Sequence, residues 1–121
     1  MNVIETRGLA KAYGERRVVS DFAMTVAAGD IYGFVGKNGA GKSTVMKMIC
    51  GAVTPTAGEV VLFGAAPERR EGRGATASAA ADQVRRIGVL IEEPALLPNL
   101  SAYDNLMAKA LALGIADGPA R

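Results

Sequence analysis

Residues 36–44 have the types and spacing needed to hold phosphate. Gly36 and Gly41 stand five positions apart and are followed directly by Lys42 and Ser43. Glycines let the backbone turn tightly and approach an anion without a clash at Cβ. The lysine ammonium suits the β- and γ-phosphates, and the serine hydroxyl is a hard oxygen ligand for Mg²⁺. The run therefore predicts a site for a nucleoside triphosphate with magnesium, of the kind called a P-loop.

The segments on either side support this interpretation. Residues 31–35 form a short apolar run, as expected of a buried strand, and residues 45–50 have the pattern of a helix. Strand, glycine loop and helix form the context in which such a loop binds phosphate. Backbone N–H groups from about Gly39 to Ser43 can then point at the anion, which the helix dipole also favours. The predicted nucleotide contacts in the loop are Gly36, Asn38, Gly39, Ala40, Gly41, Lys42, Ser43 and Thr44.

Composition limits the other classes of function. The chain has 121 residues, the size of one domain, and its net charge of +2 is too small to indicate binding to nucleic acid. Cys50 is the only cysteine, and there is no histidine for catalysis or metal ligation. The chain has no apolar signal core at its start and no run of about 18 apolar residues. We therefore expect a cytoplasmic protein.

Strands are expected in residues 1–30 and 59–63, because apolar and polar residues alternate there. The individual strands are predicted at residues 3–6, 18–26 and 59–63, with a polar turn over residues 11–17. Residues 31–51 are expected to contain the P-loop strand, the loop and a helix that ends near Gly51, a suitable residue just beyond a helix.

The second half of the chain is less regular. Residues 65–82 are rich in polar and helix-breaking residues and predict an exposed loop, although the alanines of residues 77–86 could form a helix. Residues 87–91 have the pattern of a buried strand. Ser101 is a good N-cap, with Asp104 three residues later as a weak capping box, and predicts a helix from residue 102 to about residue 113.

Two residues outside the P-loop are further candidates. Tyr13 lies beside the first predicted turn and could stack on a flat base, although a tyrosine there is more often a packing residue. Glu92 follows a buried-type strand, and ligands of open α/β sheets bind at the carboxyl ends of strands. Its carboxylate could bind Mg²⁺ or orient a water molecule, and a solvated acidic turn is an equal alternative.

Several segments match the pattern of one family together: residues 9–14, 36–44, 51–60, 87–94 and 98–106. In this combination the chain resembles the ATP-binding cassette subunits of ABC transporters. The resemblance implies that Tyr13 stacks on adenine and that the P-loop is the family's Walker A segment. It also implies that Glu92 lies in the Q-loop, where most of the family has a glutamine that contacts Mg²⁺. The sequence Ile-Glu-Glu-Pro at residues 91–94 resembles the corresponding segment of the family branch that exports bacitracin, lantibiotics and related peptides.

The resemblance implies an α/β fold. A P-loop NTPase (RecA-like) parallel core would contain strands 31–35 and 87–91. Residues 1–30 and 59–63 would form an N-terminal antiparallel β-subdomain, and residues 87–113 would contain the Q-loop-like strand and the helix that follows it. The likeness covers the first part of such a subunit only and stops before the helical subdomain is complete. The signature segment, the Walker B motif and the switch histidine of the family are not in these 121 residues.

The implied cofactors are ATP and Mg²⁺, with Ser43 and Glu92 as metal ligands and Glu92 also as the catalytic candidate. The implied partners are a second ATP-binding subunit and a membrane permease, through which the chain would associate peripherally with the membrane. Because half of the catalytic apparatus is missing, we expect ATP binding without efficient hydrolysis. Two alternatives stay open: a small-molecule or nucleotide kinase with the same loop, and a non-catalytic fragment that docks on the permease through residues 92–107.

Overall fold

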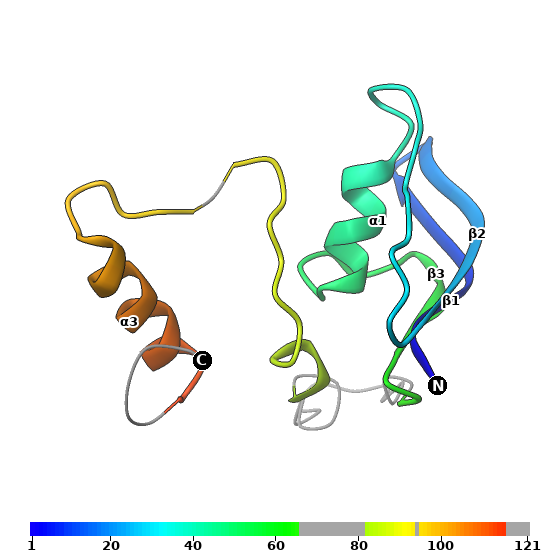
Figure 1. The fold of residues 1–121 in the computed structure, drawn as a ribbon. Helices are drawn as coiled ribbons and strands as arrows, with labels where there is room; N and C mark the ends of the chain where they lie inside the picture. Colours follow the sequence, from blue (N-terminus) through cyan, green and yellow to red (C-terminus); the bar gives the residue numbers. More distant parts are fainter. Residues whose placement is uncertain (66–81, 94, 116–121) are drawn as a thin grey trace, which may run out of the picture. The chain divides into compact units, whose positions relative to one another are not determined.

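A three-stranded antiparallel sheet with one helix against it forms the first part of the structure (Figure 1). The structure is a computed structural model, which describes residues 1–65, 82–93 and 95–115. Its backbone divides into two units, Met1–Ile91 and Glu92–Arg121. Its helices and strands are β1 (Asn2–Tyr13), β2 (Arg16–Ala27), α1 (Lys42–Ile49), β3 (Ala57–Leu62) and α3 (Ala102–Ala112).

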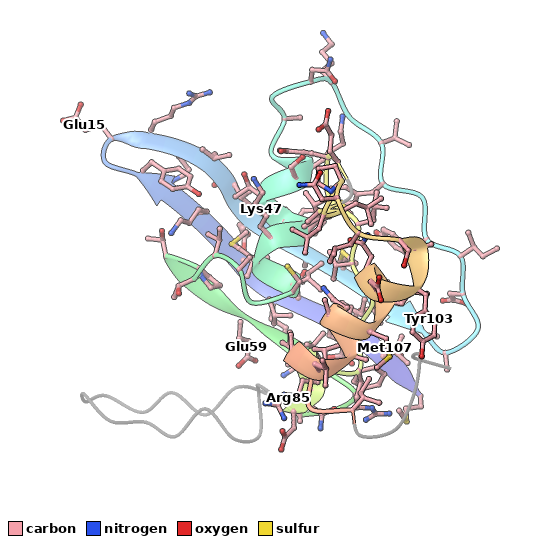
Figure 2. All side chains as sticks on the ribbon, turned by 90° about the vertical axis from the view of Figure 1, so that its left-hand side faces the viewer. Glu15, Lys47, Glu59, Arg85, Tyr103 and Met107 are labelled. Atoms are coloured by element: carbon pink, nitrogen blue, oxygen red, sulfur yellow. The ribbon has the colours of Figure 1, made fainter. Side chains whose placement is uncertain are left out.

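Strand β1 is the centre of the sheet and pairs antiparallel with β2 on one side and β3 on the other. The expected N-terminal antiparallel subdomain is therefore present. The turn predicted over residues 11–17 is wrong in extent, because Tyr13 pairs with Arg16 and only Gly14 and Glu15 connect the strands. Gly14 has a φ of +60°, which a glycine adopts without strain and which lets the strands continue to the tip of the hairpin, where Glu15 lies (Figure 2).

A bulge in β2 keeps its apolar side chains on the side of the core. Phe22, Met24 and Val26 alternate with exposed neighbours, as the sequence pattern predicts. Closer to the hairpin tip the pairing with β1 shifts, and Asp21 takes a left-handed φ of +46°. The extra residue lets Val19 point inward as well, although it lies three positions before Phe22.

The core of the first unit lies between the sheet and α1. Val45 and Met48, one turn apart on the helix, are buried against residues of all three strands. The strand residues of this cluster are Leu9, Val19, Val60 and Leu62. Burying side chains of this kind contributes about 1.5–3 kcal/mol each, so this contact fixes the helix that follows the P-loop.

Helix α1 begins and ends at glycines. Gly41 is its N-cap with a φ of +98°, and Gly51, with a φ of +77°, follows the C-cap Cys50. The predicted end near Gly51 is confirmed. The Cys50 thiol is half-buried and lies 3.4 Å from the carbonyl oxygen of Lys47, as a small filler would.

Helix α3 in the second unit begins at the predicted cap. The Ser101 hydroxyl accepts a hydrogen bond from the Asp104 N–H at 3.1 Å and donates to the Asp104 carboxylate at 2.9 Å. Gly114, with a φ of +71°, follows its C-cap Leu113, so both expected boundaries are confirmed to within a residue. Among the helices in the described ranges, none is long and apolar enough to cross a bilayer.

The two parallel core strands expected from the sequence are not formed in the described residues. Residues 31–35 and 87–91 do not form strands, and Ile31 and Val35 are 100% and 97% exposed. Phe34 alone of the first segment packs inward, with its ring edge-on to Phe22 at a centroid distance of 5.4 Å. A parallel strand requires a hydrogen-bonding neighbour, and within the described ranges nothing pairs with either segment.

One expectation falls mostly outside the described residues. The exposed loop of residues 65–82 is described only at residues 65 and 82, and residues 77–81 of the possible helix over residues 77–86 lie outside the described residues. Its last part is helical at residues 82–84.

Candidate nucleotide-binding site

The P-loop makes a tight turn before α1 begins. The Ala40 N–H donates to the Lys37 carbonyl oxygen at 3.0 Å and closes the first turn. Gly39 has a φ of +82° and Gly41 a φ of +98°, both in the left-handed region that favours glycine. Gly39 and Gly41 therefore stand where the backbone has angles that only glycine adopts without strain, whereas Gly36 has no positive φ.

Backbone donors remain available at the start of α1. No side chain caps this helix, and its first hydrogen bond runs from the Val45 N–H to the Gly41 carbonyl oxygen at 3.0 Å. The N–H groups of residues 41–44 donate to no acceptor within the described ranges. Such a set of N–H groups at a helix N-terminus suits a multiply charged anion, because the donors and the helix dipole act on it together.

Lys42 bends back over the loop that precedes it. Its ammonium group donates to the carbonyl oxygen of Gly36 and, at 3.2 Å, to that of Lys37. A Cβ at Gly36 would lie 3.6 Å from the Lys42 Cδ and 3.4 Å from the Ala40 Cβ, so the loop closes tightly on the lysine stem. An ammonium has three N–H donors, and a positive charge held in this position can also meet a phosphate.

The remaining loop residues lie where a ligand can reach them. Asn38 and Ser43 are exposed, and Thr44 is half-buried in the first turn of α1. The Ser43 hydroxyl has no hydrogen-bond partner among the described residues, so its oxygen is available to a metal ion. The geometry thus fits a triphosphate cradle with one hard oxygen ligand for Mg²⁺.

The P-loop rests on strand β2. A Cβ at Gly41 would lie 2.9 Å from the Val18 carbonyl oxygen and 3.1 Å from the Val19 Cγ2. A hollow of about 250 Å³ opens beside this contact, and its lining includes Val18, Phe22, Phe34, Ala40, Gly41 and Lys42. Close approach of the two backbones therefore depends on glycine at position 41.

Tyr13 lies at the end of β1 and its side chain is 53% exposed. It pairs with Arg16, which is two residues from Val18 along β2. Tyr13 thus belongs to the same hairpin that Gly41 contacts at Val18. The Tyr13 ring and the P-loop therefore both lie near the N-terminal end of β2. An exposed ring in this place is compatible with the predicted stacking on a base.

Glu92 is the first residue of the second unit, where it is exposed and has a left-handed φ of +64°. Within the first unit, Tyr13 belongs to the β1–β2 hairpin, which contacts the P-loop through Val18 and Gly41. Contact of Glu92 with Mg²⁺ or with water stays a prediction.

Comparison with known proteins identifies the family. A profile described as ABC transporter matches residues 19–118, which is most of the chain. The chain belongs to the ABC transporter family. It is 36% identical over 115 residues to the lantibiotic transport ATP-binding protein SrtF of Streptococcus pyogenes, a match that covers 95% of the chain and 45% of that protein. It is 37% identical over 113 residues to the bacitracin transport ATP-binding protein BcrA of Bacillus licheniformis, with 93% and 34% covered.

Solved structures of the ABC transporter family share the fold. An ATP-binding subunit of an ABC transporter superposes with a TM-score of 0.76 at 27% identity, over 95% of this chain and 44% of the other. The likeness confirms the predicted fold class. The chain spans less than half the length of these relatives.

Two contacts at this ABC transporter site escaped the sequence analysis. Val18 supports Gly41 from β2, and the Lys11 ammonium lies 5.0 Å from the centroid of the Tyr13 ring. The contact between Lys11 and Tyr13 could have been predicted from strand alternation, since residues two positions apart on a strand lie on the same face. The contact with Val18 joins segments more than twenty residues apart, and no local pattern marks it.

Proposed function

We propose that this chain binds Mg²⁺-ATP as the N-terminal part of an ATP-binding subunit that powers the export of a peptide antibiotic or a similar amphiphile. The observation that carries the proposal is the start of α1, where the N–H groups of residues 41–44 are available and the Lys42 ammonium lies against the preceding loop. The names of SrtF and BcrA supply the substrate class. Family membership favours a transport ATPase over the kinase alternative.

Each site residue then has a physical role. The N–H groups of residues 41–44 and the Lys42 ammonium hold the phosphates, and the Ser43 hydroxyl ligates Mg²⁺. The exposed Tyr13 ring stacks on adenine. Glu92 contributes a carboxylate oxygen to Mg²⁺ or to a water molecule.

Efficient hydrolysis by these residues alone is not expected. Phosphoryl transfer depends on groups that surround the γ-phosphate and position the water. The groups described here hold the phosphates from one side, at the start of α1. We propose that a second ATP-binding subunit completes the site and that the chain works in the cytoplasm.

Replacing Ser43 with alanine tests the magnesium site. The wild-type chain should bind ATP more tightly with Mg²⁺ than with a chelator, because the hydroxyl completes a ligand shell that the phosphates begin. In Ser43→Ala the benefit of Mg²⁺ should disappear, whereas affinity for metal-free ATP should stay within about twofold. Isothermal titration calorimetry with and without Mg²⁺ measures both constants.

Ser43→Thr is the matched control, because it keeps the hydroxyl in the first turn of α1. It should retain the magnesium effect. An undiminished magnesium effect in Ser43→Ala would contradict the assignment of Ser43, and absence of ATP binding by the wild-type chain would contradict the proposed function itself.

The second unit offers a surface for the permease. Its loop before α3 is held by one side chain: Asn105 accepts from the Leu97 N–H at 2.8 Å and donates to the carbonyl oxygens of Leu97, Leu100 and Ser101 at 2.9–3.1 Å. A loop fixed in this way loses little conformational entropy when it docks.

The exposed apolar side chains of this region are Leu96, Leu97, Leu100, Tyr103 and Leu106. Tyr103 and Met107 project from α3 one turn apart (Figure 2). Apolar groups gathered on a soluble surface are typical of an interface. We propose that residues 92–107 contact the membrane permease.

A charge on α3 tests this contact. Membranes that contain the transporter's permease should retain the chain, and Leu106→Asp should weaken retention about tenfold or more, because a carboxylate would be buried in the interface. Leu111→Asp is the matched control: it introduces the same charge at an exposed leucine on the same helix, beyond the proposed surface. Equal retention of both variants would contradict the proposal, and a sedimentation assay measures it.

A further inference from the structure

A lysine next to the aromatic candidate is fixed by the backbone. The Lys11 ammonium donates to the Thr54 carbonyl oxygen at 2.7 Å and lies over the Tyr13 ring, 5.0 Å from its centroid. This distance is within the range in which a cation is attracted to the face of an aromatic ring. Lys11 therefore makes two directed contacts, one with the ring and one with the main chain.

The position of Thr54 does not depend on this lysine alone. Two residues later, the Thr56 N–H donates to the Ala10 carbonyl oxygen at 2.9 Å, and the Thr56 hydroxyl accepts from the Ala12 N–H at 3.0 Å. The segment that follows α1 is thus bound to the edge of β1 directly beside Tyr13. The Thr54 carbonyl lies two residues before these contacts, and it accepts the hydrogen bond from the Lys11 ammonium.

The arrangement restricts how Tyr13 can receive a ligand. The ring is 53% exposed, and the ammonium lies over one of its faces. A flat base must therefore stack on the other face. A ring already held by a cation also has less rotational freedom to lose on binding.

We propose that Lys11 is a positioning residue for the adenine base: it holds the Tyr13 ring and directs the base to the face opposite the ammonium. This inference rests on the proposed ATP-binding function and adds a residue to its base site. We expect Lys11 to raise the affinity for ATP by positioning the Tyr13 ring and not by contacting phosphate. An effect through Tyr13 would change the affinity only for ligands that have a base, whereas a contact with phosphate would change it for tripolyphosphate as well.

The test compares a ligand that has a base with one that lacks it. Calorimetry measures the Kd of Mg²⁺-ATP and of Mg²⁺-tripolyphosphate for the wild-type chain, Lys11→Met, Lys11→Arg and Tyr13→Leu. Lys11→Met should weaken ATP binding by about two- to fivefold, the size expected for an exposed cation–π contact, and leave tripolyphosphate unchanged. Lys11→Arg, which keeps the cation and a donor for Thr54, should bind ATP like the wild type.

A double variant separates positioning from a structural effect. In the Tyr13→Leu background, adding Lys11→Met should not weaken ATP binding further, because the ring that Lys11 holds is absent. Lys109→Met removes one positive charge from α3 and controls for net charge; it should match the wild type.

Three results would overturn the assignment of Lys11 while ATP binding stands. These are an unchanged ATP affinity in Lys11→Met, an equal loss for ATP and tripolyphosphate, and a Lys11→Met effect that persists without Tyr13. A wild-type chain that binds neither ligand would contradict the proposed function, and the Lys11 inference would fall with it.

Discussion

Replacing Lys42 with methionine should weaken Mg²⁺-ATP binding about 100-fold while leaving the fold intact. Methionine keeps an unbranched apolar stem against Gly36 and removes the charge. Hydrogen bonds to charged groups contribute about 1.5–3 kcal/mol each, and 2.7 kcal/mol corresponds to a factor of about 100 in Kd. Calorimetry with Mg²⁺-ATP measures the loss, and far-UV circular dichroism shows whether the fold persists.

The size of this effect follows from where the ammonium lies. It contacts the carbonyl oxygens of Gly36 and Lys37, so it is already beside the loop before a ligand arrives. The N–H groups of residues 41–44 remain in the variant and should preserve weak binding. The loss should therefore be larger for ATP than for ADP, because the lysine is assigned to the β- and γ-phosphates.

Lys109→Met controls for the loss of one positive charge, since this lysine lies on α3 in the second unit and has no predicted role in nucleotide binding. Its affinity for ATP should be within about twofold of the wild type. The phosphate-binding role of Lys42 would be refuted by a Lys42→Met chain that is folded and binds ATP as tightly as this control.

Replacing Gly58 with alanine should destabilise the sheet by about 2–5 kcal/mol. Gly58 has a φ of +79°, and a Cβ there would lie 2.3 Å from the Gly8 carbonyl oxygen and 2.6 Å from that of Arg7. The left-handed angle costs about 1–2 kcal/mol in a residue with Cβ, and an overpacked contact adds about 1–3 kcal/mol. Because the obstructing atoms are backbone of β1, the central strand would have to move.

Gly64→Ala is the matched control for this prediction. Gly64 has a similar φ of +77°, but a Cβ there would have nothing within 4 Å, so Gly64→Ala introduces the angular strain without the clash. Urea denaturation followed by circular dichroism should show a free energy of unfolding lower in Gly58→Ala than in Gly64→Ala by at least about 1 kcal/mol. Equal losses would mean that the close approach to Gly8 is unimportant.

Much of the site could be predicted because its determinants are local. Gly39 and Gly41 have positive φ where the motif places them, and Lys42 and Ser43 begin the helix directly after them. A glycine with a positive φ, which other residues rarely adopt, forms a turn whatever the tertiary structure of the rest of the chain. For the same reason the ends of α1 at Gly51 and the cap of α3 were predicted within a residue or two.

The predicted strands at residues 31–35 and 87–91 failed for the opposite reason. Their apolar runs are suitable for burial, yet Ile31 and Val35 are almost fully exposed, because no neighbouring strand pairs with them in the described residues. Composition predicts what a segment can bury. It does not provide the partner against which the segment is buried.

The sequence by itself determined the glycine turns of the P-loop, the alternation within the strands, the helix boundaries and the family. Tertiary structure decided that β1 lies between β2 and β3. It also decided that Gly41 lies close to Val18 and that Gly58 lies close to Gly8. The hydrogen bond between the Lys11 ammonium and the Thr54 carbonyl, which holds Lys11 over Tyr13, depends on tertiary structure as well. The physical reason is the range of the forces involved. Glycine angles, capping and periodicity act between residues close in the chain, whereas these contacts join distant segments and exist only once the chain has folded.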